Sequence, residues 1–555
     1  MQRLQIFVCK SSGALNLGLL RSPEHLADLA PGCEQEAALL TPPLPSSQAY
    51  RELELWRRRL QGPLGRLRWR FLDRRVHRPR VQPPERDAPD AGLLMRIKEV
   101  LAGRIVAEHR LHRVLRSEGY WPSQIGRALD TGVFKGEIIQ MPGFAPAPWG
   151  EQICSRCGGS EARALPCRHC GSLDCLLCQS CSSLGEHRSC STLLAVPGPG
   201  CVTRPEPVEL ALDFELTPAQ KEASLELLDF WEKRQGRALV WAACGAGKTE
   251  VAFALIQRAL EEGHEVLFAI PRQDIVREVV QRLRTAFPGT ELAAHFGGQP
   301  WLASGRLVAA TTHQVLRFYR RFGLVVLDEV DAFPYQGSEM LRYGLERALA
   351  PNGQLVEMTA TPAGRRPPRV ITIPARHHGF PLPEPEIVLE KLPPWVELKP
   401  GNLPVSILEA LGSTAHRWLV FAPTIAACET IQRVLAAVLQ RPVVHCHSKL
   451  ENRSAVVEDF RCGRLDVLVT TTVLERGVNF PGIGVMVLYA DHSVFSANAL
   501  VQIAGRVGRS AETPTGPVLF FAARPAAALR EAAAMIAELN KQARERGLLS
   551  SAGLS

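Results

Sequence analysis

The sequence predicts an α/β protein with two tandem parallel-sheet domains, preceded by a Cys-rich zinc module and an N-terminal region of unknown role. Three observations predict this order. Residues 238–373 and 417–521 each alternate short apolar strands with helices, the pattern of parallel sheets covered on both faces. A Gly-rich phosphate loop follows the first strand of the first set. Eight Cys crowd into residues 154–190, before both sets.

The Gly-rich loop is the clearest functional signal in the chain. It follows the apolar strand Ala238–Trp241. Gly245 and Gly247 leave room for backbone N–H groups to surround phosphates, because neither residue carries a Cβ. Lys248 is placed to reach the β- and γ-phosphates, and the hydroxyl of Thr249 is a ligand for Mg²⁺. The loop therefore predicts a nucleotide site with bound Mg²⁺.

The first alternating set is expected to place acidic residues beside this loop. Its expected strands are Ala238–Trp241, Val266–Ile270, Arg306–Ala310, Leu324–Leu327 and Leu355–Thr359. The fourth strand ends at Asp328 and Glu329, eighty residues after Lys248. An acid there can hold Mg²⁺ through water, and its neighbour can orient or deprotonate the attacking water. The alternative, a surface acidic turn, is disfavoured by the phosphate loop upstream.

The second alternating set has no phosphate loop of its own. Its expected strands are Arg417–Phe421, Val443–His445, Val467–Thr470, Val485–Tyr489 and Pro517–Phe521. Arg506 and Arg509 lie three residues apart between glycines, and such a pair can enter the phosphate site of another domain as arginine fingers. Taken alone, these residues are more typical of exposed arginines on a helix than of arginine fingers. A terminal helix is expected at Ala533–Arg546.

The Cys-rich segment has the spacing of zinc knuckles. Three C-x-x-C pairs occur in it, and a two-residue spacer lets two thiolates bind one tetrahedral ion at about 2.3 Å. The spacing alone leaves open which Cys share an ion. The favoured first Zn²⁺ site is Cys154, Cys157, Cys178 and Cys181, and Cys167, Cys170, Cys175 and Cys190 could form a second, with His169 and His187 as spare candidates. Four thiolates leave no open position, so the expected role is structural.

The composition describes a globular chain with a moderate excess of positive charge. In 555 residues, 46% are hydrophobic and Lys plus Arg exceed Asp plus Glu by 65 to 56, a net charge of +9. This excess fits a polyanionic partner but is equally typical of a solvated basic surface. No apolar run approaches the ~18–20 residues of a membrane-spanning helix. The expectation is a cytosolic protein with reduced or metal-bound Cys.

The N-terminal region gives fewer signals. Residues 51–86 contain twelve Arg, interleaved with Trp56, Trp69 and Phe71. This mixture can hold phosphates and stack bases, or it can be a solvated helix face whose Leu and Trp pack inward. Leu93–Leu115 has apolar residues at helical spacing and predicts one amphipathic helix.

The ordered motifs together resemble a superfamily 2 DNA helicase with RecA-like domains. They comprise Gln220, the A-x-x-G-x-G-K-T loop with Ala242 at its first position, DEVD at 328–331, TAT at 359–361, TTVLERGVNFP at 471–481 and QIAGRVGR at 502–509. Within that class, DEVDAFPY, THQVLRF at 312–318 and the Cys module before the first sheet resemble the late-competence family ComFA. The resemblance covers about residues 210–525, and residues 1–150 find no counterpart in it.

The resemblance implies an ATP-driven translocase for single-stranded DNA that imports transforming DNA at the inner face of the membrane channel. It implies contacts with other competence proteins there. The implied roles are these: Gln220 reads adenine; Gly245, Gly247, Lys248, Thr249, Asp328 and Glu329 form the ATP–Mg²⁺ site; Gln502, Arg506 and Arg509 complete it from the second domain; Thr359, Thr361, Glu475 and Gly477 couple the domains; and Pro271-Arg272 with Thr311-Thr312 touch the DNA backbone.

Three rival classes are disfavoured by particular residues. A primosomal replication-restart helicase carries its Cys cluster between motor motifs, whereas all eight Cys here precede Gln220. An RNA helicase would open its last motif with HRxGR, whereas Ile503-Ala504 stand before Gly505. A zinc-built DNA-binding subunit with a degenerate motor would not be expected to keep Lys248 and Glu329. The expected domains are 1–150 (N-terminal), 151–195 (zinc module), 205–375 (first RecA-like), 376–400 (linker) and 401–545 (second RecA-like).

Overall fold

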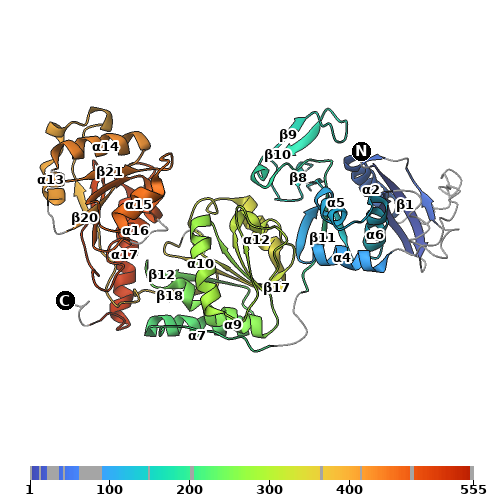
Figure 1. Ribbon diagram of the computed structural model, residues 1–555, viewed down its shortest axis with the longest axis horizontal. Helices are drawn as coiled ribbons and strands as arrows, with labels where there is room; N and C mark the ends of the chain where they lie inside the picture. Colours follow the sequence, from blue (N-terminus) through green and yellow to red (C-terminus); the bar gives the residue numbers. More distant parts are fainter. Residues whose placement is uncertain are drawn as a thin grey trace.

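The computed structural model arranges the chain as a row of units, from the N-terminal region through the Cys-rich module and a first parallel sheet to a second (Figure 1). The structure describes residues 3–11, 14–21, 37–41, 44–61, 90–147, 150–199, 206–362, 367–412, 416–439, 441–475 and 480–550. Among these residues no helix is both long enough and apolar enough to cross a membrane.

The N-terminal region begins with a small antiparallel sheet and a helix. These elements are β1 (Arg3–Ser11), β2 (Ala14–Leu20), β3 (Ala37–Leu39), β4 (Leu44–Pro45) and α2 (Ser46–Gln61). In α2, Leu53 is buried and Trp56 packs against the same small core, while Arg57 is exposed. The part of the Arg-rich segment that is described is thus a helix with apolar residues inward. Trp69 and Phe71 lie outside the described residues.

A three-stranded sheet follows, and the Cys-rich module is inserted into it. The elements are α4 (Ala91–Leu101), β5 (Arg104–Ala107), α5 (Glu108–Ser117), α6 (Pro122–Phe134), β6 (Ile139–Pro142), β7 (Phe144–Pro146), β8 (Gln152–Cys154), β9 (Ala162–Leu165), β10 (Cys175–Cys178) and β11 (Thr192–Val196). The strand order is β5-β11-β6, so β11, which follows the Cys, pairs with strands that precede them. The sheet therefore spans both sides of the expected boundary at residue 150.

The single helix expected at Leu93–Leu115 is wrong. The segment forms α4 and α5, separated by β5. Gly103 has a φ of +64°, which ends the first helix, and β5 then pairs with β11 some ninety residues later in the chain. Helical spacing continues across the break, but the distant strand partner is invisible to local periodicity.

The first sheet domain (residues 206–373) is a seven-stranded parallel sheet in the order β14-β15-β13-β16-β17-β12-β18. Its elements are α7 (Pro218–Glu232), β12 (Arg237–Ala242), α8 (Lys248–Val251), α9 (Phe253–Glu261), β13 (Val266–Ile270), α10 (Gln273–Ala286), β14 (Leu292–His295), β15 (Leu307–Thr311), α11 (Thr312–Val315), β16 (Phe322–Leu327), α12 (Glu339–Ala348), β17 (Leu349–Thr359) and β18 (Arg369–Ile373). All five expected strands are present. The prediction missed β14 and β18, the two edge strands.

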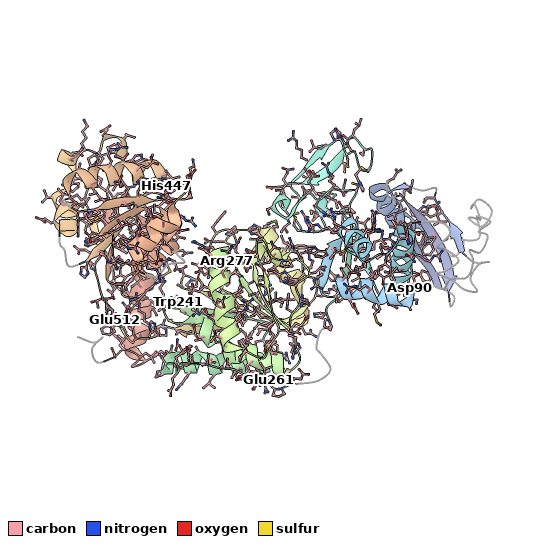
Figure 2. The ribbon with its side chains drawn as sticks, viewed as in Figure 1. Asp90, Trp241, Glu261, Arg277, His447 and Glu512 are labelled. Atoms are coloured by element: carbon pink, nitrogen blue, oxygen red, sulfur yellow. The ribbon has the colours of Figure 1, made fainter. Side chains whose placement is uncertain are left out.

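The second sheet domain (residues 386–550) is a six-stranded parallel sheet in the order β19-β24-β23-β20-β22-β21. Its elements are β19 (Glu386–Leu389), α13 (Val405–Gly412), β20 (Arg417–Phe421), α14 (Ile425–Val438), β21 (Val443–Cys446), α15 (Arg453–Arg461), β22 (Val467–Thr470), β23 (Ile483–Val487), α16 (Ala497–Ala504), β24 (Val518–Ala522) and α17 (Ala527–Glu545). The strand β19 pairs with β24, so part of the expected linker 376–400 belongs to this sheet. Figure 2 marks Trp241 in the first sheet domain and His447 in the second.

Candidate nucleotide site and zinc centres

The phosphate loop connects β12 to α8 at the carboxyl edge of the first sheet. Gly245 has a φ of +83° and Gly247 a φ of +73°, a backbone region that favours Gly. A Cβ on Gly247 would lie 2.3 Å from Nε2 of Gln220, so a side chain there would push the two apart. Lys248 is the first residue of α8, and the loop presents the start of that helix to a phosphate.

Gln220 fastens this loop to the start of α7. Thr217 Oγ1 accepts a hydrogen bond from Gln220 N, and Gln220 Oε1 accepts one from Thr217 N at 2.8 Å, which together form a capping box. Gln220 Nε2 donates to Ala246 O at 2.8 Å. The side chain is 4% exposed. In this structure its amide therefore positions the loop, and the adenine contact stays a prediction.

The acidic residues lie at the end of β16, as expected; Asp328 is buried and Glu329 is half-buried. Asp328 Oδ1 accepts a hydrogen bond from Glu329 N at 2.8 Å. Glu329 itself has a φ of +57°, an unfavourable conformation for a residue with a side chain, of the kind found at functional sites. Asp331 accepts from Thr359 Oγ1 at 2.7 Å and from Thr361 Oγ1 at 2.6 Å. The acidic motif and the end of β17 thus form one buried network.

Arg282 of α10 also belongs to this site, and the sequence interpretation missed it. Its Nη1 donates to Thr249 Oγ1 at 3.4 Å, and its guanidinium forms an ion pair with Glu250. Burial lowers the pKa of Arg282, while the charge of Asp328 opposes that shift. A cation therefore stands next to two of the predicted Mg²⁺-binding residues. Arg282 is separated from them by 33 and 46 residues along the chain, so no local spacing could have identified it.

Arg506 and Arg509 of the second sheet domain face the phosphate loop. Arg506 Nε donates to Glu475 O at 3.0 Å, and Arg509 Nε donates to Gly505 O at 2.9 Å. Burial lowers the pKa of both arginines, and the charge of Glu329 on the first domain opposes the shift in each. Gly477 lies outside the described residues. The structure thus brings charged residues from both sheet domains to one junction beside the phosphate loop.

The two domains also touch directly at the loop. Cys244 Sγ lies 3.6 Å from Oε1 of Gln502 and 3.9 Å from the carbonyl oxygen of Val501. Between the sheets, Arg376 Nη1 donates to Gly508 O at 2.6 Å. A ring nitrogen of His377 lies 3.0 Å from Gly245 O. The Pro- and Arg-rich composition of this connecting segment gave no sign of these contacts.

The Cys form two separate groups of four, with the membership expected from the sequence. In each group the sulfur atoms all lie within 4.8 Å of one another. Measured Sγ–Sγ distances in the first group are 3.9 Å (Cys154–Cys181), 3.6 Å (Cys157–Cys178) and 3.5 Å (Cys178–Cys181). A tetrahedral ion with bonds of about 2.3 Å requires about 3.8 Å between sulfurs. The residues therefore fit zinc.

The second group is Cys167, Cys170, Cys175 and Cys190, and Cys167 and Cys190 have sulfurs 3.9 Å apart. Neither spare histidine joins the groups: a ring nitrogen of the buried His187 lies 3.0 Å from Gly143 O instead. The two groups share no ligand, so each can hold one ion independently.

The first Cys group is packed onto the first sheet domain. Arg156 Nη2 donates to Cys181 Sγ at 3.0 Å and to Gly185 O at 2.7 Å, which places a positive charge beside a thiolate ligand. Arg347 of α12 donates to Ser155 O at 3.0 Å. A Cβ on Gly158, in the knuckle turn, would lie 2.8 Å from the Tyr343 ring. The zinc-binding turn and α12 therefore fit closely.

Three family models match this chain, one for each unit from residue 104 onward. They are the competence protein ComFA N-terminal domain (104–195), the type III restriction enzyme res subunit (213–364) and the helicase conserved C-terminal domain (403–511). Competence protein ComFA of Bacillus subtilis is 34% identical over 421 residues, 70% of this chain and 86% of that protein. The chain belongs to the ComFA family. ComFA of Streptococcus pneumoniae is likewise 34% identical, over 71% of this chain and 91% of that protein.

Membership of the ComFA family makes the chain a superfamily 2 helicase with two RecA-like domains, a class that uses ATP and usually Mg²⁺. ATP-dependent DNA helicase RecG of Streptococcus pneumoniae is more distant, 27% identical over 54% of this chain and 48% of that protein. The first family model corrects one expectation. The likeness to ComFA begins at residue 104, and the region before the first sheet domain has a counterpart from there onward.

Proposed function

We propose that this ComFA family member is an ATP-dependent translocase for single-stranded DNA that drives uptake of transforming DNA in natural competence. The observation that supports it most is the junction between the sheet domains. Arg506 and Arg509 approach Glu329 from the second domain, while Cys244 of the phosphate loop contacts α16. A nucleotide bound there would touch both domains, so its hydrolysis would change how they fit together.

The proposed roles follow from where each side chain lies. The backbone N–H groups from Gly245 to Gly247 and the Lys248 ammonium bind the phosphates. Glu329 orients the attacking water, and Arg506 with Arg509 stabilises the charge that develops on the γ-phosphate. Mg²⁺, when bound, supplies charge neutralisation of the phosphate oxygens. Thr249 and Asp328 are the residues that would hold it.

Arg282 has a proposed role beside the magnesium-binding residues. It occupies the neighbourhood of Thr249 and Asp328, and it would have to move aside for the magnesium ion. Gln220 holds the loop in shape through Ala246 and is the proposed adenine contact. The connection from Asp331 through Thr359 and Thr361 is the proposed route by which the nucleotide state reaches the rest of the first domain.

Zinc is proposed to shape the module between β7 and β11. Each four-Cys group has the donor set of a structural site, and bound zinc supplies folding energy to a short segment with little core of its own. The proposed partners are single-stranded DNA and competence proteins at the membrane channel. The proposed location is the cytoplasm, at the inner face of the cell membrane.

The test compares ATP hydrolysis by the full chain with single-stranded DNA, duplex DNA and RNA. We expect single-stranded DNA to stimulate strongly and with little sequence preference, because a motor that grips the backbone reads no bases. The Lys248→Ala variant should lose hydrolysis by several orders of magnitude yet still bind the strand. Stimulation by RNA alone would overturn the proposal, and so would an unaltered rate in the Lys248→Ala variant.

A further inference from the structure

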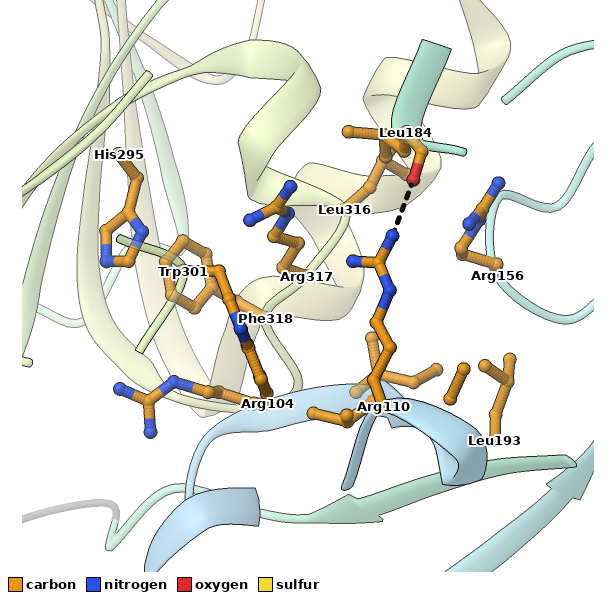
Figure 3. A pocket seen from close by; sticks show the side chains of 13 residues that line it. Arg104, Arg110, Arg156, Leu184, Leu193, His295, Trp301, Leu316, Arg317 and Phe318 are labelled. Carbon is orange, nitrogen blue, oxygen red and sulfur yellow. Dashed lines mark hydrogen bonds between the residues drawn. The ribbon is translucent and has the colours of Figure 1, made fainter. Parts of the chain in front are cut away.

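A cationic pocket lies where three units meet: the β5–β11 sheet, the zinc module and the first sheet domain (Figure 3). Its polar lining comes from Arg104, Arg110, Arg156, Arg317 and His295, and Trp301 and Phe318 are among its apolar residues. Backbone bonds close the pocket at its base. Ile105 N of β5 donates to Arg317 O at 2.8 Å, and Tyr319 N donates to Gly103 O at 3.0 Å.

No carboxylate among the described residues lines this pocket, although Arg156 is paired outside the lining with the sulfur of Cys181. None of its thirteen described lining residues is Asp or Glu. Burial lowers the pKa of Arg110, and the neighbouring Arg156 and Arg113 lower it further. Burial lowers the pKa of Arg317 too, followed by the charges of Arg110 and Arg156. Holding like charges together in a partly enclosed space costs free energy that a bound anion would recover.

Local contacts aim these side chains at a common space. Arg110 Nη2 donates to Leu184 O at 3.2 Å, which extends this arginine toward the zinc module between Arg156 and Arg317 (Figure 3). Arg156 is held by Cys181 and Gly185. Arg104 points elsewhere: it is buried and donates to the carbonyl oxygens of Leu302 and Ala303, so its role is structural.

We propose that Arg110, Arg156 and Arg317 together bind a backbone phosphate of the translocated single strand, on the side of the first sheet domain that faces the zinc module. This inference rests on the proposed function and extends it. The proposed contact extends the path of the strand from the two sheet domains to the zinc module. The zinc module then acts as one wall of the strand path, because Arg156 stands next to the ligand Cys157 and is bonded to the ligand Cys181.

Position and size favour this ligand. Arg317 lies two residues beyond the end of α11 (Thr312–Val315), which follows β15 at the carboxyl edge of the first sheet. The cavity volume is about 40 Å³, room for about three waters or for the oxygens of one phosphate group. Trp301 is half-buried at the pocket, and an aromatic ring beside arginines is the combination on which single-stranded bases stack.

The test measures the affinity of the full chain for oligothymidine over a range of salt concentrations. The double variant R110A/R317A should bind about 10- to 100-fold more weakly, the loss expected for one charge-assisted contact set. Its log–log salt slope should fall by about 0.7, the value for one phosphate of a single strand. The matched control is Arg116→Ala, an exposed arginine on the same helix, α5, which should bind as the wild type does.

A second measurement does not depend on whether the double variant R110A/R317A folds. Oligomers just long enough to fill the binding site, so that they cannot shift register, are prepared with one neutral methylphosphonate linkage at successive positions and are bound to the wild type and to the Arg317→Ala variant. We expect one linkage whose neutralisation weakens the wild type but not the variant. Equal losses at every linkage would overturn the assignment. So would an unchanged affinity and slope in R110A/R317A that keeps its zinc and its melting temperature.

Two further arms separate this inference from its alternatives. Inorganic phosphate is added at matched ionic strength. Competition that weakens oligomer binding by the wild type but not by Arg317→Ala would show that the free anion displaces a strand phosphate from this pocket, which supports the strand contact. Phosphate that binds at the pocket without any loss of oligomer affinity would assign the pocket to a free anion and overturn the strand contact. If the wild type binds no single-stranded DNA, the proposed function itself fails. If the wild type binds single-stranded DNA and all variants bind it with the same affinity, only the proposed role of this pocket fails.

Discussion

The contact between Gly505 and Cys244 offers a direct test of the junction between the two sheet domains. A Cβ on Gly505 would lie 2.4 Å from Cβ and 2.7 Å from Sγ of Cys244. Ordinary carbon contacts are about 3.5–4.0 Å, so Gly505→Ala forces an overlap of more than an ångström. The φ of Gly505 is −63°, which any residue adopts, so the substitution strains no backbone and acts mainly through this clash, with a lesser contact of 3.2 Å to Val501 O.

The expected size of the effect follows from the cost of overpacking. Adding a methyl group to a filled contact costs about 1–3 kcal/mol, which corresponds to about 5- to 150-fold fewer molecules with the junction closed. Each sheet domain can stay folded, because the overlap lies between the domains. The rate of ATP hydrolysis at saturating DNA and ATP should fall by a similar factor.

The assay compares three variants by hydrolysis rate and by circular dichroism. Gly505→Ala should be slow but folded. Gly289→Ala, whose added methyl group meets nothing within 4 Å, should match the wild type. Adding Cys244→Gly to Gly505→Ala removes both clashing atoms and should restore part of the rate. A Gly505→Ala variant with the wild-type rate would refute the reasoning, because the closed junction would then not be the state that hydrolyses ATP.

Three other predictions concern the zinc groups, the threonine network and a buried histidine. Elemental analysis should find two zinc ions per chain, and Cys178→Ser and Cys190→Ser should each lose one; loss of both ions in either variant would mean that the sites depend on each other. Thr361→Val removes the 2.6 Å bond to Asp331 and should lower the free energy of unfolding, measured with urea, by about 1–3 kcal/mol; no change would show that the network is not stabilising. Burial lowers the pKa of His295 to about 4, so the unfolded chain binds the proton first. The contribution of neutral His295 to the free energy of unfolding should be fully present above pH 6.5 and fall by about 3 kcal/mol as the pH drops toward 4. His295→Gln should remove this part of the pH dependence, and a variant with the same pH profile as the wild type would contradict the prediction.

The sequence predicted those sites whose residues lie close together along the chain. The loop that ends in Lys248 and Thr249 and the C-x-x-C pairs each have a local spacing set by the phosphate or the metal. The interior strands of both sheets are apolar runs, and they were found for that reason. Edge strands such as β14 and β18 are shorter or more polar, and they were missed.

The parts that could not be predicted depend on contacts between distant segments. Arg282 reaches Thr249 from another helix, and Arg376 reaches Gly508 across 132 residues. The break between α4 and α5 exists because β5 finds β11, which lies beyond the Cys module. The Arg110, Arg156 and Arg317 pocket draws on three units that are separate in sequence. Such sites arise only from the packing of units, and no spacing rule describes them.

The backbone bonds between Gly103, Ile105 and the segment after α11 have a mechanical consequence. Arg347 reinforces them by joining Ser155 of the zinc module to Leu316. With these attachments, the β5–β11–β6 sheet, the zinc module and the first sheet domain are joined into a single body. The second sheet domain meets that body through side chains and the 374–385 connection, so it is the less firmly attached part. If that body is held in place, any movement between the two sheet domains is a movement of the second sheet domain alone.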